Sequence, residues 1–190
     1  MKEALKYYEE IRNDYQKGKI NVVRNSDRSH NAMIMRLMLE SSDEISMFCG
    51  EMSIFRKGFY DHIKTENKER GEKIEALISK ALKDFIGREQ AKLNIILPSF
   101  DESFLNDLIV EKEEFRKVAN IHVLPSIDDK GYNEALKQLN HFSYTKDKKI
   151  TRIEDDMDLH EATLIIGLVE PIAEKTKSIF NRLSKTAVAV

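Results

Sequence analysis

Residues 92–99, KLNIILPS, and residues 120–126, NIHVLPS, decide the fold. Each is a short apolar run that ends at a Pro-Ser pair, which is typical of a buried strand. A third such run, Glu44–Cys49, ends at Gly50. Segments with helical spacing separate the three, and strands that alternate with helices predict an α/β domain whose parallel strands bring their following loops to one edge of the sheet. We expect a functional site at that edge.

The flanking segments extend the alternation. The helices that we expect are residues 29–39 capped by Ser29, 55–64, 66–86, 101–118 capped by Asp101, 132–139 and 171–183 with Pro171 in the first turn. Residues 141–145 and 149–154 flank a polar tip and predict a hairpin, and residues 162–169 predict one more strand. The economical prediction is a single sheet of about six strands flanked by helices.

The first residues form a separate element. Leu5, Tyr8, Ile11 and Tyr15 recur at steps of three and four, so they share one face of a docking helix that ends near Gly18. Residues 19–23 favour a short β segment. We therefore divide the chain into an N-terminal helical extension, residues 1–25, and one α/β domain, residues 26–190.

Composition excludes several classes of protein. The 190 residues include 31 Lys+Arg and 33 Asp+Glu, a net charge of −2, so any contact with nucleic acid must be local rather than driven by bulk charge. The longest apolar runs are too short to cross a bilayer, and residues 1–15 are too charged for a signal peptide, so we expect a cytoplasmic protein without a membrane partner. The single cysteine, Cys49, cannot form an internal disulfide, and no Cys/His cluster has zinc spacing. We expect no metal and no cofactor.

Gly-rich phosphate loops and the nucleophile elbow of serine hydrolases are absent from the sequence. The seven glycines form neither a dinucleotide fingerprint nor a P-loop, and no Gly-x-Ser-x-Gly is present. We interpret Cys49 as a packed core thiol and His30, His62 and His122 as structural or surface residues. His141 and His160 are different because they flank Arg152 and four acidic residues, Glu154, Asp155, Asp156 and Asp158. This run is either a divalent-cation site or a solvated turn, and the turn is favoured.

The order of segments from residue 29 resembles the phospholipase D-like superfamily. The resemblance rests on residues 31–53, which end in FCGEMS, on the two crossovers that end in LPS, and on the tail 140–183. Within that tail, residues 140–144 (NHFSY), 152–154 (RIE), 160–162 (HEA) and 170–174 (EPIAE) are similar to single-copy bacterial members. The family motif is His-x-Lys, four residues and Asp, followed by a Gly-Ser-x-Asn-type segment. In that family one imidazole attacks phosphorus, a second one protonates the leaving oxygen, and the lysines stabilise the phosphorane.

This chain matches the family motif only in part. His141 stands in place of the histidine, Ser143 in place of the lysine and Lys148 in place of the aspartate, with Asp147 one position early. No Gly-Ser-x-Asn segment follows. The resemblance therefore implies a phospholipase D-like module with a degenerate motif, which acts in binding or scaffolding of nucleic acid or protein in a bacterial DNA-processing or defence system.

Two other functions remain open at this stage. One is a metal-independent phosphodiesterase or nuclease that pairs His141 across a homodimer and recruits Lys146, Lys148 or Arg152 as the cation. The other is a protein-interaction module without phosphate chemistry. The candidate catalytic residue is His141, and the candidate binding residues are Glu51, Ser53, Ser99, Ser126, Ser143, Lys148, Arg152 and Glu154.

Overall fold

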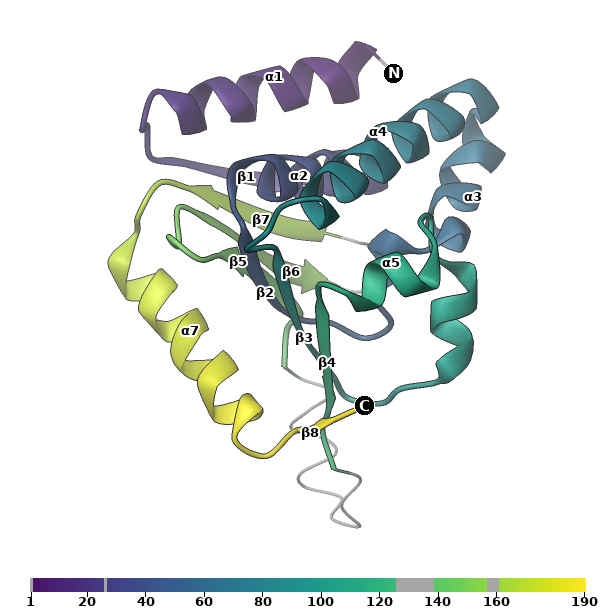
Figure 1. Cartoon of the computed structure of the whole chain (residues 1–190). Helices are drawn as coiled ribbons and strands as arrows, with labels where there is room; N and C mark the ends of the chain where they lie inside the picture. Colours follow the sequence, from purple (N-terminus) through teal and green to yellow (C-terminus); the bar gives the residue numbers. More distant parts are fainter. Residues whose placement is uncertain (1, 26, 126–138, 157–160) are drawn as a thin grey trace.

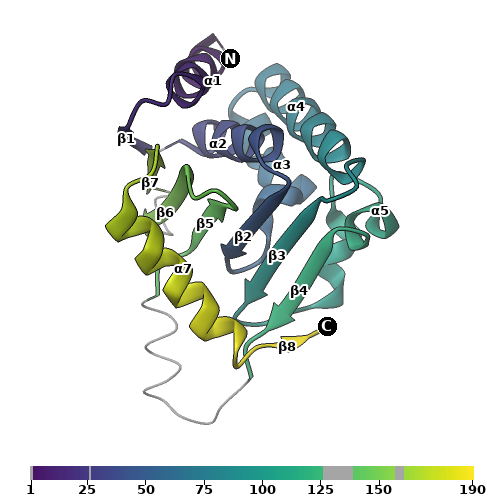
Figure 2. The same ribbon diagram turned by 60° about the vertical axis from the view of Figure 1, so that its left-hand side comes forward.

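Three parallel strands form the centre of the sheet, as the sequence predicts. They are β2 (Glu44–Phe48), β3 (Lys92–Leu97) and β4 (Ala119–Val123), and β3 pairs in parallel with both of the others. The computed structural model describes residues 2–25, 27–125, 139–156 and 161–190. Ile45, Leu93, Ile95, Ile96 and Leu97 are buried, because the sheet is covered on both faces (Figures 1 and 2).

Antiparallel strands flank this centre. They are β1 (Asn21–Asn25), β5 (Phe142–Thr145), β6 (Ile150–Asp156), β7 (Glu161–Ile166) and β8 (Val188–Ala189). Within the described residues the sheet has eight strands, in the order β1-β7-β6-β5-β2-β3-β4-β8, rather than about six. The predicted hairpin, β5–β6, is confirmed. The strands beyond these six are the two edges, β8 and β1, of which β1 overlaps the short β segment expected over residues 19–23. Both form because distant partners, β4 and β7, are available to them.

Helices cover the two faces of the sheet unequally (Figure 2). The elements are α1 (Lys2–Gln16), α2 (Arg28–Ser41), η1 (Ser53–Phe55), α3 (Lys57–Glu66), α4 (Lys68–Ile86), η2 (Glu102–Asp107), α5 (Lys112–Arg116) and α7 (Glu170–Ser184). Helix α7 packs on one face, where Phe180 joins a small core with Phe48, Ile96 and Tyr144. Helices α1 to α5 contribute to the larger core on the opposite face.

Helix α2 is nearly all apolar and buried, as predicted, but its cap is not Ser29. Asp27 is the N-cap residue, and its carboxylate accepts a hydrogen bond from the Ser29 backbone N–H at 2.6 Å. Arg70 of α4 contacts the same carboxylate at 2.6 Å. Ser29 is buried within the first turn instead, where its hydroxyl accepts a hydrogen bond from Arg70. The group that caps α2 is therefore the carboxylate of Asp27, which also binds Arg70.

The prediction of one helix over residues 101–118 is wrong. Asp101 does cap a helical segment, but this is the 3-10 helix η2, and α5 is a separate short helix. Between them Leu108, Ile109 and Val110 are buried, and the Ile109 N–H donates to the Phe55 carbonyl oxygen. Three consecutive apolar residues cannot all face the core from one side of a helix, so the helix is interrupted between η2 and α5. The helix expected over residues 132–139 lies, except for Leu139, outside the described residues.

The N-terminal segment docks on its own sheet and helices. Tyr8 and Ile11 are buried, as their spacing predicts, and the Tyr8 hydroxyl donates a hydrogen bond to Glu40 of α2. The Arg36 guanidinium lies 4.0 Å from the centre of the Tyr8 ring. Strand β1 then pairs with β7.

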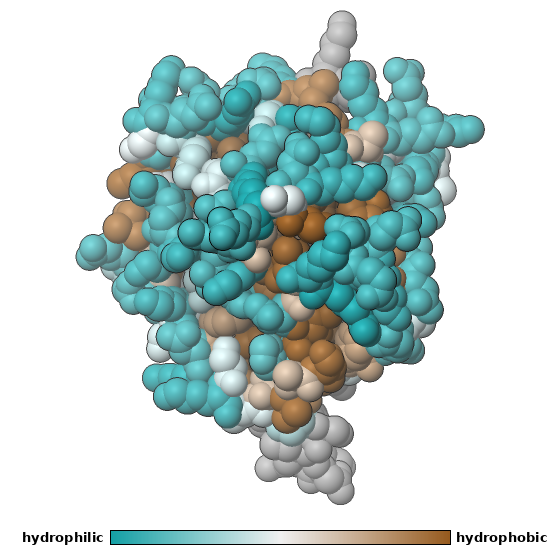
Figure 3. Space-filling view, in the orientation of Figure 1, coloured by the Kyte–Doolittle hydropathy of each residue, from teal (hydrophilic) through white to brown (hydrophobic). Residues whose placement is uncertain are grey.

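The surface is mostly polar, with apolar area toward the C-terminal edge strand (Figure 3). Val188 of β8 and the following Val190 are exposed. No helix in the described part of the chain is both long enough and apolar enough to span a membrane.

Gly71 allows α3 and α4 to approach each other closely, which gives a test of the fold. A Cβ at this position would lie 2.7 Å from the backbone nitrogen of Lys64 and 2.8 Å from its Cα. We expect Gly71→Ala to lower the free energy of unfolding by about 1–3 kcal/mol in chemical denaturation, because the two helices must move apart. Alanine in place of glycine at an unhindered helical position would instead raise the free energy of unfolding by roughly 1 kcal/mol.

Gly87→Ala is the matched control for this variant. A Cβ there would meet no atom closer than 3.6 Å, so we expect a free energy of unfolding within about 1 kcal/mol of the wild type. Equal effects of the two variants would contradict the close approach at Gly71.

Candidate functional site

Polar side chains converge at the edge of the sheet where the parallel strands end, as the alternation predicts. His141 immediately precedes β5, and its carbonyl oxygen accepts a hydrogen bond from the Glu154 N–H at 2.8 Å. Cys49 and Gly50 follow β2 at the same edge. Directly opposed residues of an antiparallel pair share a face, so His141 and Glu154 lie side by side.

Glu154 orients the imidazole of His141. The His141 Nδ1 and Glu154 Oε2 atoms are 2.9 Å apart, and the side chains are 20% and 12% exposed. Burial alone would raise the pKa of Glu154, but the hydrogen bond from His141 and the positive charge of Arg152 outweigh it and lower the pKa below its ordinary value. An ionised carboxylate only accepts hydrogen bonds, so Nδ1 carries the proton of this hydrogen bond and Nε2 is the ring nitrogen that faces away from Glu154.

The other side of the imidazole is enclosed by the β2 loop. A Cβ at Gly50 would lie 3.2 Å from His141 Cε1 and 3.5 Å from Nε2. Phe48 meets the imidazole edge to face, with ring centres 5.7 Å apart. Among the residues that the structure describes, Nε2 has no hydrogen-bond partner.

Arg152 places a cation beside this pair. It lies directly opposite Ser143 in the β5–β6 register, so both side chains lie on the face that α2 covers. One guanidinium nitrogen donates to Glu154 Oε1 at 3.2 Å, and Nε donates to Asn31 Oδ1 at 3.3 Å. Ser143 is buried and uncharged, and its hydroxyl donates to the Met38 sulfur at 3.5 Å. The cation that contacts Glu154 therefore lies on β6, across from Ser143.

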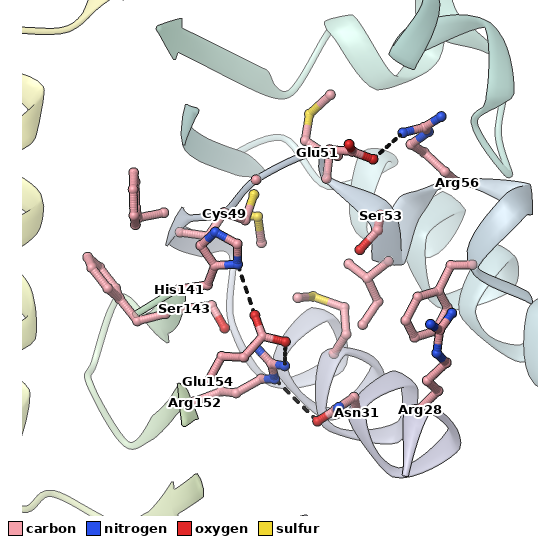
Figure 4. Close-up of a pocket in the computed structure, with 18 of the residues that line it drawn as sticks. Arg28, Asn31, Cys49, Glu51, Ser53, Arg56, His141, Ser143, Arg152 and Glu154 are labelled. Carbon is pink, nitrogen blue, oxygen red and sulfur yellow. Dashed lines mark hydrogen bonds and ion pairs between the residues drawn. The ribbon is translucent and has the colours of Figure 1, made fainter. Parts of the chain in front are cut away.

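These side chains line a pocket of about 620 Å³ (Figure 4). Its walls come from the start of α2, the loop after β2, α3 and the β5–β6 hairpin. Glu51 lies on the loop, where it pairs with Arg56 at 3.1 Å, and Ser53 begins η1. Arg56 also lies 3.7 Å from Asp107, so its charge is shared between two carboxylates.

The structure brings together six of the residues singled out from the sequence and separates the others. His141, Glu51, Ser53, Ser143, Arg152 and Glu154 all line the pocket. Ser99 is exposed and does not line it. Lys148 pairs with Glu174 of α7 and Lys146 with Glu44, so the hairpin tip is distant from the pocket. Ser126 lies outside the described residues.

The sequence-based selection missed Arg28, Asn31 and Phe59, which also line the pocket. Asn31 is 3% exposed and immediately precedes a nearly unbroken apolar run. A polar residue beside such a run is the sequence signal that could have identified Asn31, because buried polar side chains need hydrogen-bond partners. His62, expected to be a surface residue, is exposed on α3 and lines the same pocket. Cys49 lines it too but packs against the core, and burial raises the pKa of its thiol to about 12.

The acidic run is described only in part, and its first three residues, Glu154, Asp155 and Asp156, end strand β6 rather than form the turn that the sequence favours. Asp155 accepts a hydrogen bond from Thr163 at 2.6 Å, whereas Asp158 and His160 lie outside the described residues. Within the described ranges, His, Cys, Asp and Glu side chains form no group of three or more that could hold a metal ion.

Comparison with known proteins identifies the fold. No protein-family model matches the chain, and no curated protein matches it. A phospholipase D family member, Nuc from Salmonella typhimurium, is similar over 90% of this chain and 97% of its own, with a TM-score of 0.52 and 8% identity. NucT from Helicobacter pylori is similar over 90% and 99%, with a TM-score of 0.52 and 11% identity.

A third structure is similar over part of its length. TrmBL2, an archaeal chromatin protein, matches 90% of this chain with a TM-score of 0.49 and 18% identity, and the chain spans 54% of the length of TrmBL2. The likeness to Nuc and NucT confirms the phospholipase D-like α/β fold predicted from the sequence.

Glu154→Gln tests the charged hydrogen bonds of the site. We expect this variant to lower the free energy of unfolding at pH 7 by about 1–3 kcal/mol, because it removes a partly buried, charge-assisted pair. The folded-state pKa of Glu154 is lowered, so its contribution is complete above the ordinary pKa of 4.5 and is lost as the pH falls through the folded-state pKa. The difference between wild type and variant should therefore shrink below about pH 4.

Urea unfolding at a series of pH values measures this difference. Glu72→Gln is the control, since Glu72 and Lys68 form an exposed pair on α4 whose loss should change stability by less than about 0.5 kcal/mol. A difference between wild type and Glu154→Gln that stays constant down to pH 3 would contradict a stabilising Glu154 carboxylate.

Proposed function

We propose that this chain is a phospholipase D-like module that binds phosphodiester groups of nucleic acid in the pocket beside His141, and that its catalytic motif is degenerate. The observation that carries the proposal is the position of Arg152 directly across the hairpin from Ser143. A cation is thus kept at the pocket, but as an arginine on the strand opposite the position where the family has its lysine.

The chemistry of Arg152 suits a phosphate ligand. A guanidinium presents several N–H donors in one plane and binds phosphate oxygens in a bidentate manner. Its side chain is only 14% exposed, so water screens its charge less than that of a surface cation. Asn31 and Glu154 hold it in place, which lowers the entropy that a ligand must remove on binding.

The same contacts argue against efficient phosphoryl transfer. A catalytic cation must stabilise charge that develops in the transition state, and loss of such a group costs about 10²–10³ in rate. The charge of Arg152 is already compensated by Glu154, and Ser143 cannot supply another. A phosphodiester is already anionic, so binding it requires less positive charge from the site than stabilising the additional negative charge of a phosphorane.

Arg152→Gln tests the binding proposal. We expect it to weaken binding of a labelled single-stranded DNA and to reduce the slope of log K against log salt by roughly 0.7, the value for one lost phosphate contact. Fluorescence anisotropy at several salt concentrations measures both quantities, and Arg152→Lys should restore part of the affinity.

Arg36→Gln is the matched control, because Arg36 is also partly buried and paired but lies outside the pocket. Thermal unfolding of each variant separates lost binding from lost fold. If wild type binds DNA and Arg152→Gln binds it equally well, the nucleic-acid contact lies elsewhere. A wild type that binds no DNA or RNA would refute the proposal and leave a protein-interaction module.

A metal-independent phosphodiesterase is the second candidate, and the His141–Glu154 geometry favours it. The carboxylate holds the proton on Nδ1, so Nε2 carries the lone pair that a nucleophilic imidazole needs. A second imidazole could come from a partner in a homodimer. His62 lines the same pocket, however, so it could also come from this chain.

Hydrolysis assays decide between a degenerate site and an active one. With a chromogenic phosphodiester or labelled DNA in EDTA, we expect wild type and His141→Ala to show the same background rate. Hydrolysis by wild type that falls by about 10³ or more in His141→Ala, with an unchanged melting temperature, would establish the phosphodiesterase instead. His62→Ala and light scattering would then show whether the second imidazole belongs to the same chain or to a second copy.

A further inference from the structure

The pocket is larger than a phosphate group requires. Its volume of about 620 Å³ is in the range of sites that hold whole small molecules, about 300–1,000 Å³. The polar groups His141, Arg152 and Glu154 occupy one side of it (Figure 4). Much of the remaining lining is apolar and comes from Met35, Met47, Met52, Ile54 and Phe59. A ligand that fills the pocket therefore has an anionic group and an apolar one.

An aromatic ring and a guanidinium lie across the pocket from His141. Figure 4 shows Arg28 on that side, and its guanidinium carbon lies 5.9 Å from the centre of the Phe59 ring. This distance is near the outer limit of a cation–π contact, and the Phe59 ring is only partly buried and lines the pocket, where a planar group can reach it. His62 follows Phe59 by three residues on α3 and lines the same side.

Contacts with the core and with Tyr60 hold the Phe59 ring in position. It is partly buried against the core and meets Tyr60 edge to face, with ring centres 5.1 Å apart. The start of α3 is fixed as well, because the Gly58 N–H donates to the Asp107 carboxylate at 3.1 Å. Phe59 is thus a preorganised aromatic surface rather than a mobile side chain.

We propose that Phe59 is a stacking platform for a nucleobase, and that the ligand is single-stranded nucleic acid with a phosphate at Arg152 and a neighbouring base on Phe59. The inference rests on the proposed function and names its substrate class. Bases stack on aromatic side chains with little sequence preference, and only an unpaired base offers its face in this way. An acyl chain would need an enclosed aliphatic cavity, whereas Ser53 and His62 are exposed at this pocket.

An oligonucleotide without bases separates stacking from phosphate binding. Labelled single-stranded DNA of about 12 nucleotides and an abasic strand of equal length and charge are titrated by anisotropy with wild type, Phe59→Leu and Phe100→Leu. Leucine keeps the apolar bulk but cannot stack. Phe100 is the control because it is also partly buried and contacts another aromatic ring, Phe104, but lies outside the pocket.

We expect wild type and Phe100→Leu to bind the intact strand about fivefold or more tighter than the abasic one, and Phe59→Leu to lose this preference. Phe59→Tyr retains an aromatic face, so it should keep the preference even if Phe59→Leu is unstable. Equal affinities of wild type for the two strands, both dependent on Arg152, would overturn the platform and leave the proposed function intact. If neither strand binds, the proposed function itself is wrong, and binding of anionic phospholipid vesicles instead would assign the apolar side to an acyl chain.

Discussion

Helix α2 lies between the sheet on one side and helices α1 and α4 on the other, and its side chains are buried almost all the way round. Such a helix has one stable position, because any rotation would move apolar side chains out of the core. Asn31 belongs to this helix and accepts a hydrogen bond from Arg152. The burial of α2 therefore fixes a polar group at the pocket, and the orientation of the pocket side chains depends on the packing of the larger core.

From Asn31 the hydrogen bonds continue through Arg152 and Glu154 to His141. The carboxylate of Glu154 is shared between a guanidinium and an imidazole, which keeps it ionised in spite of its burial. A ligand phosphate must compete with Glu154 for the guanidinium. The same pair thus preorganises Arg152 and limits its affinity for anions, which favours ligands that also contact the apolar side of the pocket.

The elements that the sequence predicts well are those with strong local patterns. Apolar runs that end at proline or glycine gave β2, β3 and β4, and the polar tip gave the β5–β6 hairpin. Local pattern indicated a β segment over residues 19–23, near β1, but both edge strands, β1 and β8, depend on partners far away in sequence, so it could not show that they join the sheet. At the site, the chain order already placed His141 and Glu154 at equal distances from the hairpin tip. Arg28, Asn31 and Phe59 come from α2 and α3, and only packing brings those helices to the hairpin.

Strand β1 pairs with β7, residues 161–166, so its partner is synthesised long after it. At ribosomal rates of about 5–20 residues per second, β1 waits on the order of ten seconds for its partner. During that time the β2–β3–β4 centre and α2 are already complete, and α1 can dock on α2 through Tyr8. The order of synthesis therefore differs from the order of strands in the sheet, and the strand that leads into the pocket at Arg28 is among the last to be paired.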